Sequence, residues 1–403
     1  VAQMRIREKL ISDMPNRNNF NRTTDEMGVL LHELNKKRKI MPLRKLFKTI
    51  PNLLLKLKPC LMMSPLSVSY FLEAETYKFD MVIFDEASQI FPQDAIGAIC
   101  RGKQVIIAGD SKQLPPTSFF AASTNNTDGE YDSDEEEDDV IYDSILEEAT
   151  NSLPNRSLLW HYRSRNEDLI AFSNQEIYKN KLITFPSSNT VAADSGVEYV
   201  YVENGTYSGR CNIQEANKCV ELIKEHIDKH ADRSLGIIAF SEKQQSTIEE
   251  AVQKFRERNP RYESFFSEDK EEPFFIKNLE NVQGDERDTI IFSICYAKDP
   301  NGRMYMRFGP LGHQGGERRL NVAITRAKHN IKLVGSIMTY DIDLSKTKSE
   351  GIRMLKDYIE FAIKGSAVLH PHKSSNVLYE TDEFCNGVAR FITSKGYHVK
   401  QYV

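Results

Sequence analysis

Two adjacent carboxylates, Asp85 and Glu86, directly follow the apolar run 81–84. The run predicts a strand that is buried on both faces, so the two acids stand where that strand ends. Open α/β sheets bind their ligands at the carboxyl ends of their strands. An aspartate there can hold Mg²⁺ on a nucleotide, and a neighbouring glutamate can orient and deprotonate a water molecule. Such pairs also arise by chance in surface turns, so this one needs support from the rest of the chain.

Two further strand ends carry polar residues of a suitable kind. The run 105–108 predicts a second buried strand, and the sequence GDSKQLPPT follows it at 109–117. A short strand is predicted at 157–159, and Arg163 and Arg165 come shortly after it. The planar guanidinium group of arginine suits bidentate recognition of phosphate better than the ammonium group of lysine does. The pattern therefore predicts phosphate chemistry.

The same combination of residue types recurs near the carboxyl end of the sequence. Gly284 and Glu286 precede a strong strand that is predicted at 289–295. The sequence RRLNVAITRAK at 318–328 predicts a helix that leads to a strand at 331–334. Helical spacing places Leu320 and Ile324 on one face and the pair 325–326 on another.

Five of these segments resemble motifs II to VI of superfamily 1 helicases, and they stand in the same order. Their resemblance is to the 5′-to-3′ branch, which includes the nonsense-mediated-decay helicase. The segments are 85–89, 109–116, 160–165, 281–288 and 318–328. His161 stands where that family usually has glutamine, and Asn278 and Asn281 stand where it more often has hydroxyl residues. The ordered set is far more specific than any of its members.

The resemblance implies a role in ATP hydrolysis for several residues. Asp85 is expected to hold Mg²⁺, Glu86 to activate water, and Gln113 to sense the γ-phosphate. Arg163 and Arg326 are expected to act as arginine fingers. The resemblance also implies nucleotide-side roles for three further residues: Gly284, Glu286 and Gln244.

The resemblance also implies contacts with single-stranded DNA or RNA, made mainly to the backbone and with little sequence reading. The segment 60–67 reads as a strand that stops at a Ser-Pro step, which leaves its hydroxyl groups free. Simple turn residues are an equally good interpretation of these serines. The residues expected to contact nucleic acid are Ser64, Ser67, Pro116, Thr117, Asn281 and Thr325.

One part of the expected nucleotide site is missing from the sequence. No GxxxxGK[ST] sequence occurs in the 403 residues, although this loop cradles the phosphates in P-loop enzymes. In the resembled family it lies upstream of motif II, so we expect it to precede Val1. The expected fold is an α/β fold of the P-loop NTPase type with two RecA-like parallel-sheet domains, the first of them truncated.

The expected domain organisation follows from the motifs and from changes in composition. A helical, basic segment is expected at 1–59 and a partial first RecA-like domain at 60–124. A second RecA-like domain is expected at 153–364, joined to the first through an acidic disordered loop at 125–140 and a connector at 141–152. Residues 365–403 are expected to be a linker and the start of a possible endonuclease-like domain.

Charge is distributed very unevenly along the chain. Residues 36–58 contain nine lysines or arginines and no acid, whereas nine of the twelve residues 128–139 are acidic. The basic segment is either an electrostatic track for a phosphate backbone or a solvated helix face, two interpretations that the sequence supports about equally. The acidic segment is a disordered loop, or less plausibly a mimic of nucleic acid.

Whole-chain composition limits the class of protein. The hydrophobic content of 40% and the charged content of 28% are ordinary for a globular chain. The net charge of −5 argues against a generally basic nucleic-acid binder, although it averages over very uneven segments. The six cysteines form no CxxC pair, which favours a reduced, cytoplasmic setting. We expect ATP, Mg²⁺ and single-stranded nucleic acid as partners, no membrane, and a monomer. The competing interpretation is a non-catalytic nucleic-acid-binding or regulatory module that keeps the helicase fold.

Overall fold

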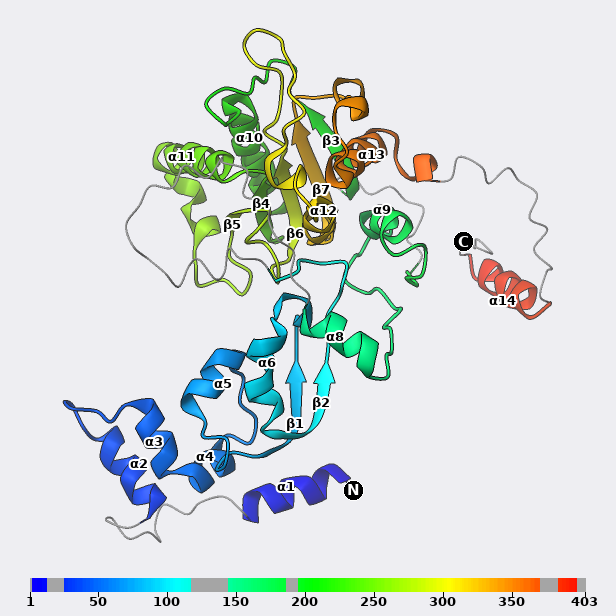
Figure 1. The fold of residues 1–403 in the computed structure, drawn as a ribbon. Coiled ribbons are helices and arrows are strands. Elements are labelled where there is room, and N and C mark those ends of the chain that lie inside the picture. The colour runs from blue at the N-terminus through cyan, green and yellow to red at the C-terminus, as the bar shows by residue number, and fades with distance from the viewer. Residues whose placement is uncertain (1, 13–24, 117–143, 186–194, 370–382, 397–403) are drawn as a thin grey trace. The chain divides into compact units, whose positions relative to one another are not determined.

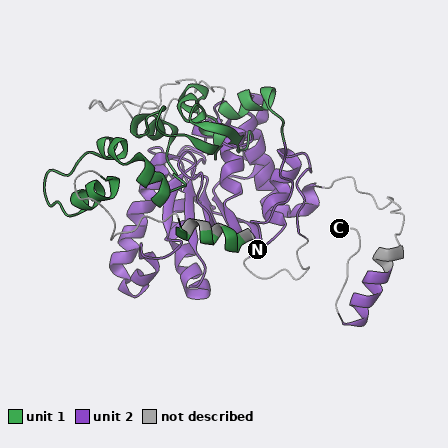
Figure 2. Ribbon diagram, turned by 90° about the horizontal axis from the view of Figure 1, so that it is seen from below, with its two compact units in different colours: residues 1–111, 115–133, 140–155 green, residues 112–114, 134–139, 156–403 purple. Residues whose placement is uncertain are grey.

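The computed structural model describes residues 2–12, 25–116, 144–185, 195–369 and 383–396 (Figure 1). The chain divides into two compact units, which are coloured separately in Figure 2. Unit 1 comprises residues 1–111, 115–133 and 140–155, and unit 2 comprises residues 112–114, 134–139 and 156–403. The predicted acidic loop and Thr117 lie outside the described residues.

Unit 1 is built from short helices and a two-stranded sheet. Three of its helices have proline in the first turn, where the missing N–H group costs no hydrogen bond. Its helices are α1 (Ala2–Ser12), α2 (Glu26–Leu34), α3 (Leu43–Thr49), α4 (Pro51–Leu57), α5 (Pro65–Phe71), α6 (Pro92–Ile99) and α8 (Ile145–Ser152). Its strands are β1 (Phe79–Phe84) and β2 (Gly102–Ile107), and a 3₁₀ turn, η1 (Ala87–Gln89), follows β1.

Strands β1 and β2 are parallel, with Val82 opposite Val105 and Phe84 opposite Ile107. These four side chains belong to one hydrophobic cluster with Ala95 of α6. On the other face, Met81, Ile83 and Ile106 are 43%, 63% and 46% exposed. The prediction that the first strand is buried on both faces is therefore wrong for this chain, because only one of its faces packs against described helices.

Unit 2 contains a five-stranded parallel sheet in the order β3-β7-β6-β4-β5. Its strands are β3 (Gly196–Tyr201), β4 (Leu235–Ala239), β5 (Phe275–Asn278), β6 (Arg287–Ser293) and β7 (Ala327–Gly335). Its α-helices are α9 (Asp168–Glu176), α10 (Ile213–His230), α11 (Glu242–Arg258), α12 (Gly316–Ile324), α13 (Glu350–Lys364) and α14 (Glu383–Ser394). Its 3₁₀ turns are η2 (Pro260–Phe266), η3 (Gly309–Leu311), η4 (Thr339–Asp341), η5 (Leu344–Lys346) and η6 (Ser366–Leu369).

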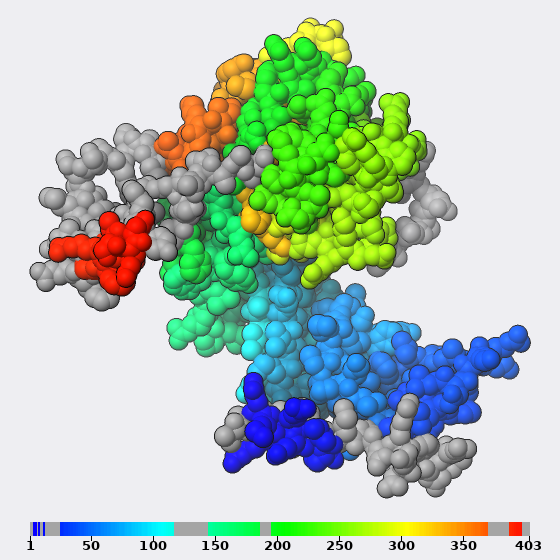
Figure 3. All heavy atoms as spheres, turned by 180° about the vertical axis from the view of Figure 1, so that it is seen from behind, coloured from blue at the N-terminus to red at the C-terminus, as the bar shows by residue number. Residues whose placement is uncertain are grey.

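Successive side chains along the strands of unit 2 point to opposite faces of the sheet, so the sheet contributes to two hydrophobic cores. Ile237 and Ile291 point into a cluster with α10 and α11, whereas their neighbours Ile238 and Ile290 point into a cluster with α12 and α13. Helices α10 and α11 lie side by side over one face of the sheet (Figure 1), and the green and yellow-green atoms of this part of the chain form neighbouring areas of the surface in Figure 3. The parallel sheet with helices on both faces confirms the predicted α/β class and RecA-like fold.

Two local predictions are wrong. Residues 60–67 form no strand, because Ser64 caps the helix α5 that begins at Pro65. Residues 157–159 form no strand either, and only an isolated bridge joins Trp160 to Ile183. The segment 256–273 is polar overall, yet the aromatic side chains of its turn η2 are buried in the cluster beneath α10 and α11.

No helix among the described residues combines the length and the apolar character that crossing a membrane requires.

Truncating a side chain on the packed face of β1 should destabilise unit 1 far more than truncating one on its exposed face. Phe84 is 4% exposed, so Phe84→Ala should lower the free energy of unfolding of unit 1 by about 3–5 kcal/mol. Ile83→Ala removes a side chain that is already 63% exposed and should lower it by less than about 1 kcal/mol. Urea unfolding of the two variants measures the difference. Equal losses would show that the Ile83 face is covered.

Candidate functional site

The acid pair of unit 1 stands at the carboxyl end of β1, as predicted. Glu86 has φ 51° and ψ 40°, a left-handed conformation that is uncommon for residues other than glycine. Its N–H group donates a hydrogen bond to Oδ1 of Asp85 at 3.0 Å. Strained backbone of this kind persists where the surroundings enforce it, often at functional sites. The turn holds two carboxylates next to each other at one strand end.

The loop after β2 closes tightly against this turn. The N–H group of Ala87 donates to the carbonyl of Ala108 at 2.9 Å. A Cβ atom at Gly109 would lie 3.0 Å from the nitrogen of Ala87 and 3.1 Å from that of Ser88. A side chain at 109 would therefore crowd the backbone where the two strand ends approach each other. Ser88 is buried there, and its hydroxyl oxygen has no hydrogen-bond partner among the described residues.

Asp85 fits the role of a magnesium ligand. Its carboxylate is exposed at the strand end. Proteins usually bind Mg²⁺ through one or two carboxylates, and the remaining positions are filled by water and by the phosphates of the substrate. A single exposed aspartate at this edge matches that donor set.

In unit 2 the charged residues gather at the amino ends of the parallel strands. Nε of Arg163 lies 2.7 Å from Oε2 of Glu286, and Oε1 of Glu286 lies 3.3 Å from Nζ of Lys328. Lys328 also pairs with Glu272. We call these four residues the ion-pair ladder. Burial alone would lower the pKa of Lys328, but its bonds to the two glutamates outweigh that effect and raise it.

Hydrogen bonds to backbone carbonyls also connect the ion-pair ladder and its neighbour Arg165 to the start of β7. Nη1 of Arg163 donates to the carbonyl of Thr325 at 3.3 Å, and the N–H group of Arg165 donates to the carbonyl of Lys328 at 2.7 Å. These bonds bring Arg163 to the amino ends of β6 and β7. The prediction that Arg163 follows a strand end is therefore wrong, because residues 157–159 form no strand.

The second predicted finger, Arg326, lies beside the predicted sensor, Gln113. Arg326 is 2% exposed, and its Nε donates to the carbonyl of Val322 at 2.7 Å. Its Nη2 lies 3.5 Å from Oε1 of Gln113. The carbonyl of Lys112 accepts a hydrogen bond from Asn321 of α12 at 3.0 Å, which fixes this tripeptide in unit 2. The structure thus brings together two residues that are far apart in the sequence.

Gly284 and His161 have clear local reasons for their residue types. Gly284 has φ +90°, which a residue with a side chain rarely adopts, and Glu286 follows two residues later. Nε2 of His161 lies 2.8 Å from the hydroxyl oxygen of Ser164 and accepts from the N–H group of Ser164 at 3.2 Å. Burial, together with the positive charge of Arg163, lowers the pKa of His161. The imidazole of His161 is therefore neutral near pH 7 and is held by Ser164.

Gln244 lies away from the ion-pair ladder. It is fully buried at the carboxyl edge of the sheet, whereas the ladder is at the amino edge. Its Oε1 accepts from the N–H group of Asn212 at 2.8 Å, and its Nε2 donates to Ser293 at 2.9 Å. A nucleotide-side role for Gln244 is therefore disfavoured, because its amide group is used inside unit 2.

The predicted nucleic-acid residues are placed unevenly. Ser64 accepts from the N–H group of Ser67 at 3.2 Å, and both are partly or fully exposed. Asn281 is exposed as well, whereas Pro116 is buried. The hydroxyl group of Thr325 is buried and donates to carbonyls of α12, so it is turned away from solvent.

A buried polar network around Glu215 was not predicted. Its carboxylate accepts from Ser293 at 2.8 Å, from the N–H group of Cys295 at 2.7 Å, and from Ser336 at 2.9 Å. Asn212 caps α10 and also donates to Glu215 at 3.1 Å. The signal that could have revealed it is the Asn-x-x-Glu pattern at the start of a predicted helix. This hydrogen-bond network occupies the carboxyl edge of the five-stranded sheet of unit 2.

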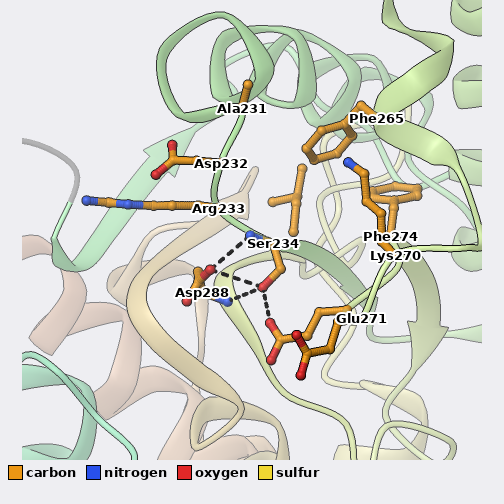
Figure 4. A pocket seen from close by; sticks show the side chains of 11 residues that line it. Ala231, Asp232, Arg233, Ser234, Phe265, Lys270, Glu271, Phe274 and Asp288 are labelled. Atoms are coloured by element: carbon orange, nitrogen blue, oxygen red, sulfur yellow. Dashed lines mark hydrogen bonds between the residues drawn. The ribbon is translucent and has the colours of Figure 1, made fainter.

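A pocket opens at the end of the ion-pair ladder (Figure 4). It has a volume of about 300 Å³ and is lined by Ser234, Phe265, Phe274 and Asp288 among others. The hydroxyl group of Ser234 donates to Glu272 at 2.5 Å and to Asp288 at 3.2 Å. Glu272 belongs to the ion-pair ladder and also lines this pocket, so the ladder extends to the pocket wall.

Comparison with known proteins agrees with the motif resemblance. Two family models described as "AAA domain" match residues 61–120 and 141–338. Uncharacterized ATP-dependent helicases of Mycoplasma genitalium and Mycoplasma pneumoniae are 38% identical over 326 and 327 residues, which cover 78% of this chain. The probable helicase senataxin of Homo sapiens is 26% identical over 278 residues, which cover 65% of this chain and 10% of that protein. The chain spans 28% of the length of the two mycoplasma relatives. These matches support the assignment of this chain to the superfamily 1 helicases.

Titration of Glu215 gives a test of the buried network. Burial raises its pKa from 4.5 to about 7, although its hydrogen bonds oppose the shift. A raised carboxyl pKa stabilises the fold most below the unfolded value, and that contribution is lost as the pH rises from 4.5 through 7. The unfolding free energy of the parent should therefore fall by about 3 kcal/mol over that range relative to Glu215→Gln.

Chemical denaturation of both proteins at several pH values measures this difference. The matched control is Glu221→Gln, on an exposed position of the same helix, which should follow the parent. Parallel pH profiles for the parent and Glu215→Gln would show that Glu215 titrates normally.

Proposed function

We propose that this chain is the part of an ATP-dependent superfamily 1 helicase that carries motifs II to VI. The whole protein would couple ATP hydrolysis to movement on single-stranded nucleic acid and to duplex unwinding. The observation that supports this most strongly is the assembly in unit 2 of Arg163, Glu286, Arg326 and Gln113, four residues predicted from separate motifs. Packing alone does not call for two arginines held beside a glutamate and a glutamine at one sheet edge.

Phosphoryl transfer to water needs charge neutralisation and a positioned nucleophile. Unit 1 and unit 2 would each meet part of this need. In unit 1, Glu86 would orient and deprotonate the attacking water. Asp85 would hold Mg²⁺, which would supply charge neutralisation for the phosphates of the nucleotide. In unit 2, Arg163 and Arg326 would stabilise the charge that develops in the transition state, and Gln113 would report the γ-phosphate to Arg326.

The phosphate cradle would come from sequence outside the 403 residues, since no GxxxxGK[ST] loop occurs within them. We therefore expect the chain alone to hydrolyse ATP barely, and the longer protein to hydrolyse it efficiently. The missing loop also leaves room for a second candidate function, a nucleic-acid-binding module without turnover. Reading the sequence before Val1 separates the two.

The arginine roles predict a large and selective loss of turnover. In the longer protein, Arg163→Ala and Arg326→Lys should each lower the rate of ATP hydrolysis by about a thousandfold. The exposed Arg307→Ala serves as the matched control and should leave the rate unchanged. Steady-state hydrolysis assays measure the rates, and thermal unfolding checks that Arg326→Lys keeps the buried position folded.

Rates within a few-fold of the parent for both finger variants would refute these roles. Robust hydrolysis by the 403-residue chain alone, lost in Glu86→Gln, would refute the need for an external phosphate cradle.

A further inference from the structure

The pocket at the amino ends of β4 and β6 has an aromatic wall. Phe265 and Phe274 form this wall, and their ring centroids are 6.4 Å apart. The ammonium group of Lys270 lies 4.3 Å from the centroid of the Phe265 ring (Figure 4). Aromatic ring faces attract cations, and aromatic cages are a common way to recognise organic ammonium ligands. The wall therefore already holds one ammonium group, which the chain itself supplies.

Another side of the pocket offers a carboxylate oxygen. Oδ2 of Asp288 accepts hydrogen bonds from the N–H group of Ser234 at 2.9 Å and from its hydroxyl group at 3.2 Å. Oδ1 of Asp288 lies 3.7 Å from Nε2 of His329. Burial lowers the pKa of His329, so its ring is neutral near pH 7. A neutral ring does not compensate the charge of Asp288, and Oδ1 can accept a hydrogen bond from a cation.

The lining of the pocket contains more acids than bases. The acids are Asp232, Glu271, Glu272 and Asp288, and the bases are Arg233 and Lys270. Glu272 is paired with Lys328 of the ion-pair ladder, which leaves three acids and two bases. Arg233 extends away from both aromatic rings (Figure 4). This combination of charge and aromatic surface disfavours an anion and favours a cation that has an apolar body.

We propose that this pocket binds an alkylammonium cation, with its charged end at Asp288 and its carbon chain against Phe265 and Phe274. The ligand would take the place of the Lys270 ammonium group at the Phe265 ring. A volume of about 300 Å³ suits a small ligand. A metal ion alone is disfavoured, because no group of three or more His, Cys, Asp or Glu side chains in the described ranges is placed to hold one.

A free polyamine and a lysine side chain of a partner protein both have this chemistry. Isothermal titration calorimetry of the 403-residue chain with putrescine and with N-acetyl-lysine amide, in about 0.1 M salt to screen general charge, tests the site. We expect saturable binding at one site. Tighter binding of putrescine would support a free polyamine as the ligand, and tighter binding of the lysine derivative would support a protein side chain. No saturable binding of either compound would overturn the proposal.

Variants on the two sides of the pocket should weaken binding. Asp288→Asn removes the charge but keeps an acceptor for the N–H group of Ser234, and it should lower the affinity about tenfold or more. Phe274→Leu keeps an apolar side chain but removes the ring, and it should lower the affinity about fivefold. The matched control is Glu221→Gln, which removes an exposed acid of α10 and should bind like the parent. Thermal unfolding checks that each variant is folded.

Lys270→Gln should have the opposite effect. It should raise the affinity about two- to fivefold, because the ammonium group no longer competes for the Phe265 ring. The matched control is Lys243→Gln, which removes an exposed lysine of α11 and should leave the affinity unchanged. The acidic segment 128–139 also attracts polyamines, so the differences between variants are the decisive readout.

Two results would show that general charge, rather than this pocket, holds the cation. They are parent-like binding by both Asp288→Asn and Phe274→Leu, and equal gains in affinity for Lys270→Gln and Lys243→Gln. Either result would overturn the proposal. The proposed function would stand in both cases, because these titrations contain neither ATP nor nucleic acid.

Discussion

The structure of unit 2 depends on pairing charges that the sheet brings together at its amino edge. Parallel strands place all their amino ends on one side, so residues at or just before the starts of β5, β6 and β7 meet there whatever their separation in sequence. Unpaired charges in such a half-buried place are costly. The alternation of Arg163, Glu286, Lys328 and Glu272 avoids that cost, because each charge has a neighbour of opposite sign.

The two edges of this sheet are used in opposite ways. At the carboxyl edge, where open α/β sheets usually bind ligands, the hydrogen bonds of Glu215 and Gln244 are made within unit 2. At the amino edge, Arg163 and Glu286 remain about one third exposed, at 35% and 38%, although they are paired. A paired but accessible arginine can exchange its partner for a phosphate at little cost. The carboxyl edge thus acts as a structural anchor and the amino edge as the candidate reactive surface.

The sequence predicted those features that depend on local pattern. The acid pair after a buried run, the glycine at 284 and the helix before Arg326 all follow from apolar periodicity and residue type. Predictions that required tertiary context were wrong or incomplete. Hydrophobicity at 157–159 reflects an exposed patch rather than a strand, and the buried setting of Gln244 follows from Asn212 and Ser293, which are distant in sequence. Glu215 looks like an ordinary helix-start glutamate until the strands close over it.

We propose that these residues serve ATP hydrolysis that is coupled to movement along single-stranded nucleic acid. The most direct measurement is the Mg²⁺-dependent rate of ATP hydrolysis by the longer protein with and without a single-stranded oligonucleotide. We expect the oligonucleotide to stimulate hydrolysis strongly, because strand binding and turnover would be coupled. No Mg²⁺-dependent hydrolysis under either condition, in a folded protein that contains the upstream sequence, would contradict it.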